Sequence, residues 1–219
     1  MFEIVLHHHD FVVAYKPAGV SFHSETEAGF VVLLEAQLGI KLYAVHRLDK
    51  VTSGLIILAT HSGAASMLTD MFSNRVIDKF YLALIDAKPK KKQGWVKGDM
   101  AKARRGAYKL LKTSDNPAIT RFYSQSIAEG LRAVVLKPFS GKTHQLRVAL
   151  KSLAAPILGD ELYGGTQSDR VYLHAYALSL VWQGEQIQLQ APPVEGQWYR
   201  VYLQHQQAKQ WQQPWLLEW

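Results

Sequence analysis

The sequence predicts an α+β protein with a mixed, mostly antiparallel sheet and flanking helices. Three observations carry this prediction. Short strands rich in Val and Ile follow one another in hairpin-like succession, helices of 3.6-residue period stand between some of them, and no linker rich in Pro or Gly divides the chain. The chain has 219 residues, enough to bury one core, and we expect a single domain over residues 1–219.

The apolar pattern predicts each element in turn. Strands are expected at 2–6, 11–15, 55–59, 79–85, 118–125, 131–137, 171–181 and 186–190. Helices are expected at 30–38, 63–72 and 143–153. Gly39 is the expected end of the first helix, and Ser62 and Thr143 are the expected N-caps of the other two. The segment 204–219, rich in Gln and Trp, is expected to pack onto the domain as a tail.

The composition is that of an ordinary globular chain. Hydrophobic residues make up 48% and charged residues 20%, a balance that excludes a disordered protein. Because there are no cysteines, thiol nucleophiles, disulfides and cysteine-ligated zinc are excluded. The N-terminus has no basic segment followed by an apolar run, and apolar stretches such as 55–60 are strand-sized. We therefore expect no signal peptide, no membrane partner and a cytoplasmic location.

The basic charge is concentrated in one segment. The formal net charge is +7, and residues 88–112 hold ten basic residues against one acid, Asp99. Such a block attracts a polyanion, most commonly a nucleic acid, although a solvated loop that only aids solubility has the same composition. Trp95 and Tyr108 lie within the block, and aromatic rings among cations are surfaces on which single-stranded bases stack.

Three consecutive histidines, His7, His8 and His9, resemble a metal-binding tract. Adjacent side chains of a strand point to opposite faces, and we identify no acidic or cysteine partner at ligand spacing. We therefore expect a structural or surface role for these histidines and no metal site in the chain.

Residues 44–59 place charged side chains where strand packing does not need them. His46, Arg47, Asp49 and Lys50 crowd together before a Thr-Ser-Gly turn that leads into an apolar strand. A carboxylate there lies at a sheet edge or a cleft floor, where burial tunes its pKa. The competing interpretation is an Asp that only caps the turn through a backbone N–H, and the residues alone favour it.

A second candidate segment spans residues 137–165. Residues 140–143 (SGKT) lead straight into a helix, and exposed N–H groups at such a start suit a phosphate of a nucleic-acid backbone. His144 and Arg147 are three residues apart and share a helix face. The arginine is either a packed or solvated stem, or the fixed ionic partner that keeps a catalytic carboxylate deprotonated.

The ordered motifs of the chain resemble those of the RluA-type pseudouridine synthases. His46-Arg47-Leu48-Asp49 followed by Thr52-Ser53-Gly54 resembles the HRLDxxTSG signature of this family. The further matches are KPAG at 16–19, KFYLAL at 79–84, GKTHQLR at 141–147, ILGDELYG at 157–164 and LHA at 173–175. Lys142, Ser140 and Ala149 depart from the Arg, Thr and His common in the family, which bears on RNA contacts more than on chemistry.

The resemblance implies the pseudouridine synthase catalytic fold with a central cleft. It implies an isomerase that cuts the bond between uracil and ribose, turns the base and rejoins it through carbon, without a cofactor. Asp49 is then the essential carboxylate, Arg147 its ionic partner, and Tyr81 the residue that stacks on uracil and is a candidate base for the C5 proton. Attack on ribose, attack on the base and removal of a ribose proton all remain open as the role of Asp49.

The implied partner is a structured RNA, ribosomal or transfer, acted on by a monomer in RNA processing. The target base has to leave the stack to reach Asp49, and by analogy Arg47 fills the vacated place. The residues expected to contact RNA are His46, Arg47, Lys142, Thr143, His144, Lys90, Lys91, Lys92, Arg104 and Arg105. Two alternatives remain: an RNA-binding module of the same fold without activity, and a two-carboxylate hydrolase that uses Asp49 and Asp160.

Overall fold

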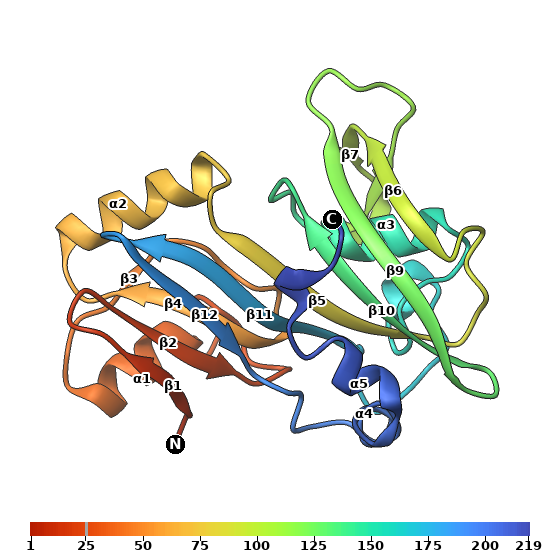
Figure 1. Cartoon of the computed structure of the whole chain (residues 1–219). Coiled ribbons are helices and arrows are strands. Elements are labelled where there is room, and N and C mark those ends of the chain that lie inside the picture. The colour runs from red at the N-terminus through yellow and green to blue at the C-terminus, as the bar shows by residue number, and fades with distance from the viewer. Residues whose placement is uncertain (25) are drawn as a thin grey trace. The chain divides into compact units, whose positions relative to one another are not determined.

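A computed structural model describes residues 1–24 and 26–219 of the chain (Figure 1). These residues form two compact units. Unit 1 comprises residues 1–78 and 174–193, and unit 2 comprises residues 79–173 and 194–219. Within the described residues, no helix combines the length and the apolar character that crossing a membrane requires. That the whole chain is one catalytic domain stays a prediction.

Unit 1 is built on strands in the order β1–β2–β4–β11, with β3 also paired to β4 and β12 to β11. All its pairs are antiparallel except β4 with β11, which run parallel. Its elements are β1 (Ile4–His7), β2 (Phe11–Lys16), α1 (Phe30–Leu38), β3 (Tyr43–Ala44), β4 (Ser53–Ala59), α2 (Ser62–Ser73), β11 (Leu173–Trp182) and β12 (Glu185–Gln190).

The core of unit 1 lies where α2 meets the sheet. Leu55 and Ile57 alternate along β4 and share one face, and Leu68 of α2 packs against that face together with Trp182 of β11. Every residue of β2 and β4 is buried, as the uninterrupted apolar runs predict. Full burial of a Leu or Ile side chain stabilises a fold by about 1.5–3 kcal/mol, so these two strands form a rigid base for the loops at their ends.

The two helices of unit 1 end and begin through specific caps. Gly39 ends α1 in a left-handed conformation (φ 67°) and donates its N–H to the carbonyl of Glu35, as predicted. The predicted cap of α2 is wrong. His61, not Ser62, is the N-cap, because its Nδ1 accepts the N–H of Ala64 and takes the place of a hydroxyl oxygen.

Unit 2 is built on an antiparallel sheet in the order β5–β10–β9–β6, with a separate ribbon of β7 and β8. Its strands are β5 (Asp78–Ile85), β6 (Gln93–Gly98), β7 (Met100–Lys102), β8 (Tyr108–Leu110), β9 (Ala118–Ala128) and β10 (Leu131–Pro138). Its helices are η1 (Arg104–Gly106), α3 (Gln145–Ser152), η2 (Glu161–Tyr163), α4 (Gln197–Gln204), α5 (Gln206–Gln210) and η3 (Pro214–Leu216).

Helix α3 begins later than predicted. Residues 143 and 144 form a turn, and the N-cap is His144, which adopts a left-handed conformation (φ 57°) and makes no side-chain capping bond. The prediction of Thr143 as the cap is therefore wrong. The helix contacts β8, β9 and β10, and Leu150 is completely buried there.

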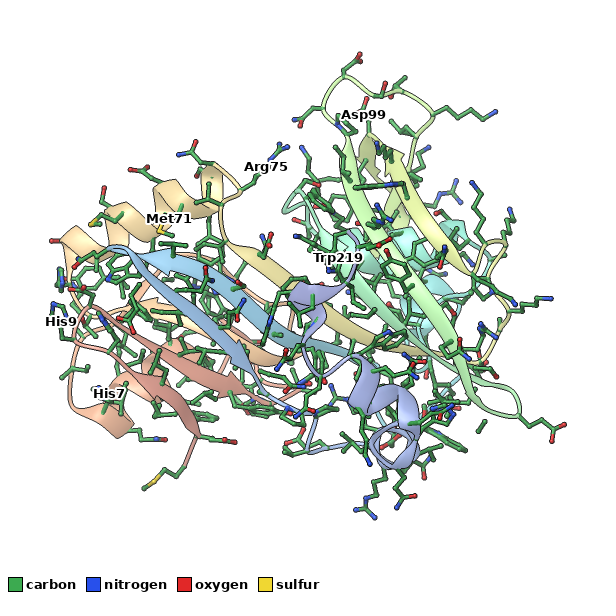
Figure 2. All side chains as sticks on the ribbon, in the orientation of Figure 1. His7, His9, Met71, Arg75, Asp99 and Trp219 are labelled. Carbon is green, nitrogen blue, oxygen red and sulfur yellow. The ribbon has the colours of Figure 1, made fainter. Side chains whose placement is uncertain are left out.

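The C-terminal tail packs onto unit 2, as predicted. The ring of Trp219, labelled in Figure 2, lies 5.5 Å from the ring of Phe80 and 5.3 Å from that of Tyr123, centroid to centroid. The hydroxyl of Tyr199 in α4 donates to the carbonyl of Leu82 at 3.3 Å. The tail thus covers one face of the β5–β10–β9 sheet, the face opposite to Tyr81.

Candidate active site

Asp49 lies in the loop between β3 and β4 of unit 1. It directly precedes a turn at Lys50 and Val51, and the N–H of Thr52 donates to the Asp49 carbonyl at 3.0 Å. Leu48 is buried, Asp49 is half-buried and Arg47 is exposed. Leu48 therefore anchors the loop in the core, while the charged side chains on either side of it retain access to a ligand.

The buried side chain of Lys16 holds the end of this loop. Its Nζ donates to the carbonyls of Pro17 and Thr52 at 2.9 Å each and to that of Lys50 at 3.3 Å. The N–H of Gly19 donates to the Lys50 carbonyl at 2.8 Å. A buried ammonium is costly unless it is hydrogen-bonded, so these carbonyls fix the cation and the cation fixes the loop. This role of Lys16 was not predicted from the sequence. The sequence feature that could have indicated it is a lysine at the end of an otherwise apolar strand.

The Thr-Ser-Gly turn is fastened to β11. His174 donates from Nε2 to the carbonyl of Ala191 at 2.8 Å, which leaves Nδ1 to accept the Ser53 hydroxyl at 2.8 Å. A Cβ on Gly54 would meet the carbonyl oxygen of Ala175 at 2.2 Å, so only glycine fits there. The motif therefore needs Ser for the bond and Gly for the close approach, and the LHA motif supplies the partner histidine.

His46 supports the loop from the side of α2. Its Nε2 accepts the N–H of Ile57 at 2.9 Å, and its ring stacks on Phe72 with centroids 4.3 Å apart. The imidazole is half-buried and has a structural task in unit 1. A contact between His46 and RNA stays a prediction.

Arg147 in unit 2 is held by a carboxylate. Its Nε donates to one oxygen of Asp160 and its Nη2 to the other, both at 2.7 Å, and both side chains are buried. Its guanidinium carbon also lies 4.9 Å from the centre of the Tyr163 ring. A planar guanidinium held by two N–H groups along one edge and by a ring on one face has a fixed orientation. The sequence predicts Asp49, which lies in unit 1, as the partner of Arg147; that pairing stays a prediction.

The Arg147–Asp160 pair bears on the hydrolase alternative. A two-carboxylate mechanism needs one carboxyl group to serve as an acid at the scissile bond. Both oxygens of Asp160 accept from the buried guanidinium, so this carboxylate is engaged in positioning Arg147.

Tyr81 lies in β5 with the alternation that the sequence predicts. Phe80 and Leu82 are buried on one face of the strand, and the half-buried Tyr81 points to the other face, opposite Leu136 of β10 in register. Its ring is therefore separated from the face that the C-terminal tail covers.

Gln145 organises the turn before α3. Its Oε1 accepts the Ser140 hydroxyl at 2.8 Å and the N–H of Lys142 at 3.0 Å, and its Nε2 donates to Thr120 Oγ1 and the Ile119 carbonyl at 3.0 Å. The sequence motif contains this residue, but its role was missed. The N–H of Lys142 is therefore engaged within the protein, while the side chain of Lys142 is half-buried and that of Thr143 exposed. Contact of these two residues with RNA stays a prediction.

His144 joins this turn to the ribbon. The hydroxyl of Tyr163 accepts the N–H of Tyr108 at 3.0 Å and is hydrogen-bonded to His144 Nδ1 at 2.8 Å. One hydroxyl thus connects β8, η2 and the start of α3.

Comparison with known proteins identifies the family. Residues 10–152 match the family described as RNA pseudouridylate synthase. The chain belongs to this family. It is 51% identical over 201 residues to an "Uncharacterized RNA pseudouridine synthase" of Haemophilus influenzae, covering 90% of each protein. It is 33% identical over 208 residues to the "Ribosomal large subunit pseudouridine synthase C" of Rickettsia bellii, covering 86% of this chain and 68% of that protein.

Solved structures confirm the fold. The "Human RNA Pseudouridylate Synthase Domain Containing 4" matches with a TM-score of 0.72 and 26% identity over 91% of each chain. The "Human RNA Pseudouridylate Synthase Domain Containing 1" has a TM-score of 0.73 at 24% identity, covering 88% of this chain and 84% of that one. The predicted family and α+β fold are confirmed, and the protein is an RNA pseudouridine synthase, an isomerase.

The basic block of the synthase is ordered and exposed. It is not one loop: it contains β6, β7, η1 and β8, and all ten of its basic residues are exposed. Residues 90–92 precede β6, and Arg104 and Arg105 form η1 at the tip of the ribbon. Lys97 Nζ lies 4.7 Å from the centre of the Trp95 ring. This surface has the charge and the aromatic group that nucleic-acid contacts use.

Asp99, the one acid of the block, shapes the segment that follows the ribbon. Its carboxylate accepts the N–H groups of Asp115 and Asn116 at 3.0 and 2.8 Å (Asp99 is labelled in Figure 2). A hydrogen bond from the Thr113 side chain, helped by these two amides, lowers the pKa of Asp99. The Asp99 carboxylate thus accepts hydrogen bonds from within the protein, and these bonds organise the basic surface.

Proposed function

We propose that this synthase converts uridine to pseudouridine in a structured RNA, ribosomal or transfer, with Asp49 as the essential carboxylate. The observation that carries the proposal is the support of the Asp49 loop: the buried Lys16 ammonium, the Ser53–His174 bond and the Gly54 contact all fix the backbone that directly follows the half-buried Asp49. A loop held from several sides is preorganised, which a catalytic residue requires and a turn cap does not.

The reaction balances within the substrate. The bond between N1 of uracil and C1′ of ribose breaks, the bond between C5 and C1′ forms, C5 loses a proton and N1 gains one. Uridine supplies both halves, so no cofactor is part of the proposal. Each of the three roles open to Asp49 requires an ionised carboxylate sheltered from water, and we assign Arg147 to keep it ionised.

Tyr81 and the basic residues complete the assignment. We assign Tyr81 to stack on the target uracil and to receive the C5 proton. The exposed Arg47 takes the place of the extruded base, and Lys142, Thr143, His144, the lysines at 90–92 and the arginines at 104–105 contact the RNA. The name of the Rickettsia relative favours a ribosomal substrate. The proposed enzyme acts as a monomer in the cytoplasm.

The decisive experiment maps pseudouridines across total RNA from cells with and without the gene, then restores either wild type or Asp49→Asn. We expect one or a few sites to be lost with the gene and regained only with wild type. The matched control is Asp70→Asn, because Asp70 is an exposed aspartate of α2 in the same unit. Regain of the sites with Asp49→Asn overturns the catalytic assignment.

A binding measurement separates the enzyme from an inactive binding module of the same fold. Purified Asp49→Asn protein should bind the identified RNA within a few-fold of wild type, since the substitution removes charge at the reacting centre only. If deletion of the gene removes no pseudouridine while the wild-type protein binds RNA, the binding module is the correct interpretation.

A further inference from the structure

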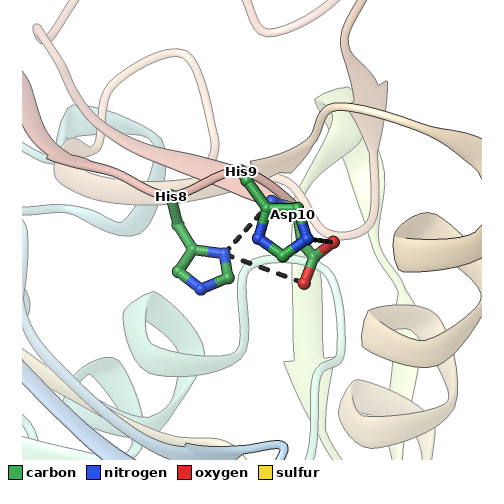
Figure 3. A group of neighbouring side chains, drawn as sticks. All are labelled: His8, His9 and Asp10. Atoms are coloured by element: carbon green, nitrogen blue, oxygen red, sulfur yellow. Dashed lines mark hydrogen bonds and ion pairs between the residues drawn. The ribbon is translucent and has the colours of Figure 1, made fainter.

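Unit 1 carries a cluster of possible ligand groups that pseudouridine formation does not use. At the turn between β1 and β2, one ring nitrogen of His8, one ring nitrogen of His9 and a carboxylate oxygen of Asp10 all lie within 4.8 Å of one another (Figure 3). His9 Nε2 is 2.8 Å from Asp10 Oδ1, and His8 Nδ1 is 3.8 Å from Oδ2. The sequence prediction of no metal site rested on the opposite faces of adjacent strand residues and on the lack of an acidic partner. The strand β1 ends at His7, so His8 and His9 lie outside it, and Asp10 is an acidic neighbour.

The separations fit a metal polyhedron. In a tetrahedral zinc site, with bonds of about 2.0–2.1 Å, two ligand atoms are about 3.3 Å apart. The separations of His9 Nε2 from Oδ1 (2.8 Å) and of His8 Nδ1 from Oδ2 (3.8 Å) lie on either side of that value. They end on the two oxygens of one carboxylate, so the three side chains are close enough for one ion to bind between them.

Asp10 is prepared as a ligand. Its side chain is only 5% exposed, and Oδ2 accepts the indole N–H of Trp182 at 2.8 Å. His61 uses Nδ1 to accept the N–H of Ala64, so its proton is on Nε2, which donates to Asp10 Oδ1 at 2.9 Å. Hydrogen bonds that orient a ligating carboxylate are typical of the surroundings of protein metal sites.

The two imidazoles also meet the requirements of ligands. His8 Nδ1 accepts the N–H of Asp10 at 3.1 Å, so this nitrogen carries no proton, and the ring is held by stacking on Phe11 at 4.6 Å between centroids. His9 has a side chain that is 77% exposed, and its Nε2 lies 2.8 Å from Asp10 Oδ1, so this ring nitrogen faces the other ligand groups. A bound cation replaces two contacts, the hydrogen bond from the Asp10 N–H to His8 Nδ1 and the contact between His9 Nε2 and Asp10 Oδ1, with three metal–ligand bonds.

We propose that His8, His9 and Asp10 bind one divalent transition-metal ion of the Zn²⁺ class, with His61 and Trp182 as positioning residues. Two imidazoles and one carboxylate favour Zn²⁺, Ni²⁺ or Co²⁺ over Mg²⁺ and Ca²⁺, which prefer oxygen ligands. The turn that carries the ligands is tied through Asp10 to α2 and to the end of β11, so the ion stabilises unit 1. Water completes the coordination, and no step of the RNA reaction passes through the metal.

The test titrates ZnCl₂ into the untagged, chelator-treated full-length protein by calorimetry. The variants are His9→Gln, whose exposed side chain makes unfolding no concern, and His7→Gln as the matched control two residues away (both histidines are labelled in Figure 2). We expect one equivalent of Zn²⁺ per chain, affinity weakened about tenfold or more by His9→Gln, and no change with His7→Gln. Thermal unfolding of wild type, but not of His9→Gln, should shift upward with Zn²⁺.

Two results overturn this proposal. One is the absence of Zn²⁺ binding to wild type, which makes the cluster a closed hydrogen-bond network around Asp10. The other is equal affinity in wild type and His9→Gln, which assigns the binding to other histidines. The visible absorption of bound Co²⁺ supplies an independent readout, since it should be present in His7→Gln and lost in His9→Gln. RNA modification is a separate measurement, so its outcome does not affect this test.

Discussion

Lys16 Nζ donates to the carbonyl of Thr52, 36 residues further along the chain, and this bond fixes the end of the loop that carries Asp49. Lys16→Met keeps the length of the side chain but leaves three carbonyls without this donor. We expect the free energy of unfolding to fall by about 1–3 kcal/mol, the cost of an unsatisfied buried polar group, and kcat to fall more than RNA affinity. Denaturant unfolding and single-turnover kinetics measure the two effects. The control is Lys50→Met, an exposed lysine of the same loop, which should unfold like wild type.

Gly54→Ala should lower the free energy of unfolding substantially, although it adds only one methyl group. The added methyl group would lie 2.2 Å from the Ala175 carbonyl oxygen, and φ at this position is +111°. Forcing β4 and β11 apart should cost about 1–3 kcal/mol or more, measured by urea unfolding. Gly141→Ala is the control, because nothing lies within 4 Å of the place that its methyl group would occupy. Equal stability of the two variants would contradict the close approach.

Asp160→Asn tests whether Asp160 positions Arg147. The substitution leaves a buried guanidinium without its charge partner, which typically costs about 3–5 kcal/mol. We also expect pseudouridine formation to fall. Arg147→Lys keeps the positive charge but not the planar pair of N–H groups that binds both oxygens of Asp160, so it should lose activity as well. Normal activity of Arg147→Lys would show that charge alone suffices at this position.

Replacing Lys90, Lys91 and Lys92 together by Gln should flatten the salt dependence of RNA binding. Each lost phosphate contact lowers the slope of log affinity against log salt by about 0.7–0.9. Filter binding over a range of salt concentrations measures the slope. The control replaces Lys41 and Lys209, two exposed lysines outside the block, and should leave the slope as it is. An unchanged slope in the triple variant would return residues 90–92 to the solubility interpretation.

Asp169 should make stability depend on pH in the acid range. Burial acts to raise its pKa, but hydrogen bonds from the Tyr172 hydroxyl and the N–H of Gln197 outweigh it, and the pKa is lowered from 3.8. The folded state thus binds this proton less readily than the unfolded state, so the contribution is present above pH 4 and is lost as pH falls through the folded pKa. Asp169→Asn should remove this contribution, so the free energy of unfolding, measured with urea from pH 2 to 7, should fall less at acid pH than it does in wild type. Asp86→Asn, at an exposed position, should keep it.

Local patterns explain how much of the fold was predictable. The fully apolar runs of β2 and β4 and the alternation in β5 identify strands, because the residues themselves report burial. The strands of the basic block were missed because β7 and β8 have only three residues each and β6 has one buried large apolar residue, Val96, which is too little to show an apolar period. The cap of α2 was missed because histidine seldom serves where the neighbouring serine could.

The site was predictable as a set of motifs but not as a set of bonds. Asp49, Tyr81 and Arg147 were found through their motifs. The partners that hold these residues depend on contacts between distant segments, such as Arg147 with Asp160 and Lys16 with Thr52. The histidine triplet was interpreted from its position in the sequence alone, where Asp10 looks like an ordinary turn residue. In the folded protein the Asp10 carboxylate is buried beside two imidazoles.

The hydrogen bond between Ser53 and His174 has a consequence for folding during synthesis of the protein. The two residues are 121 positions apart, so a nascent chain lacks the final support of the HRLD loop until the ribosome has translated most of the message. Until then the first residues of β4, Ser53 and Gly54, have no β11 to pair with. Catalytic competence therefore arrives late in translation, and prematurely terminated fragments should be inert and short-lived.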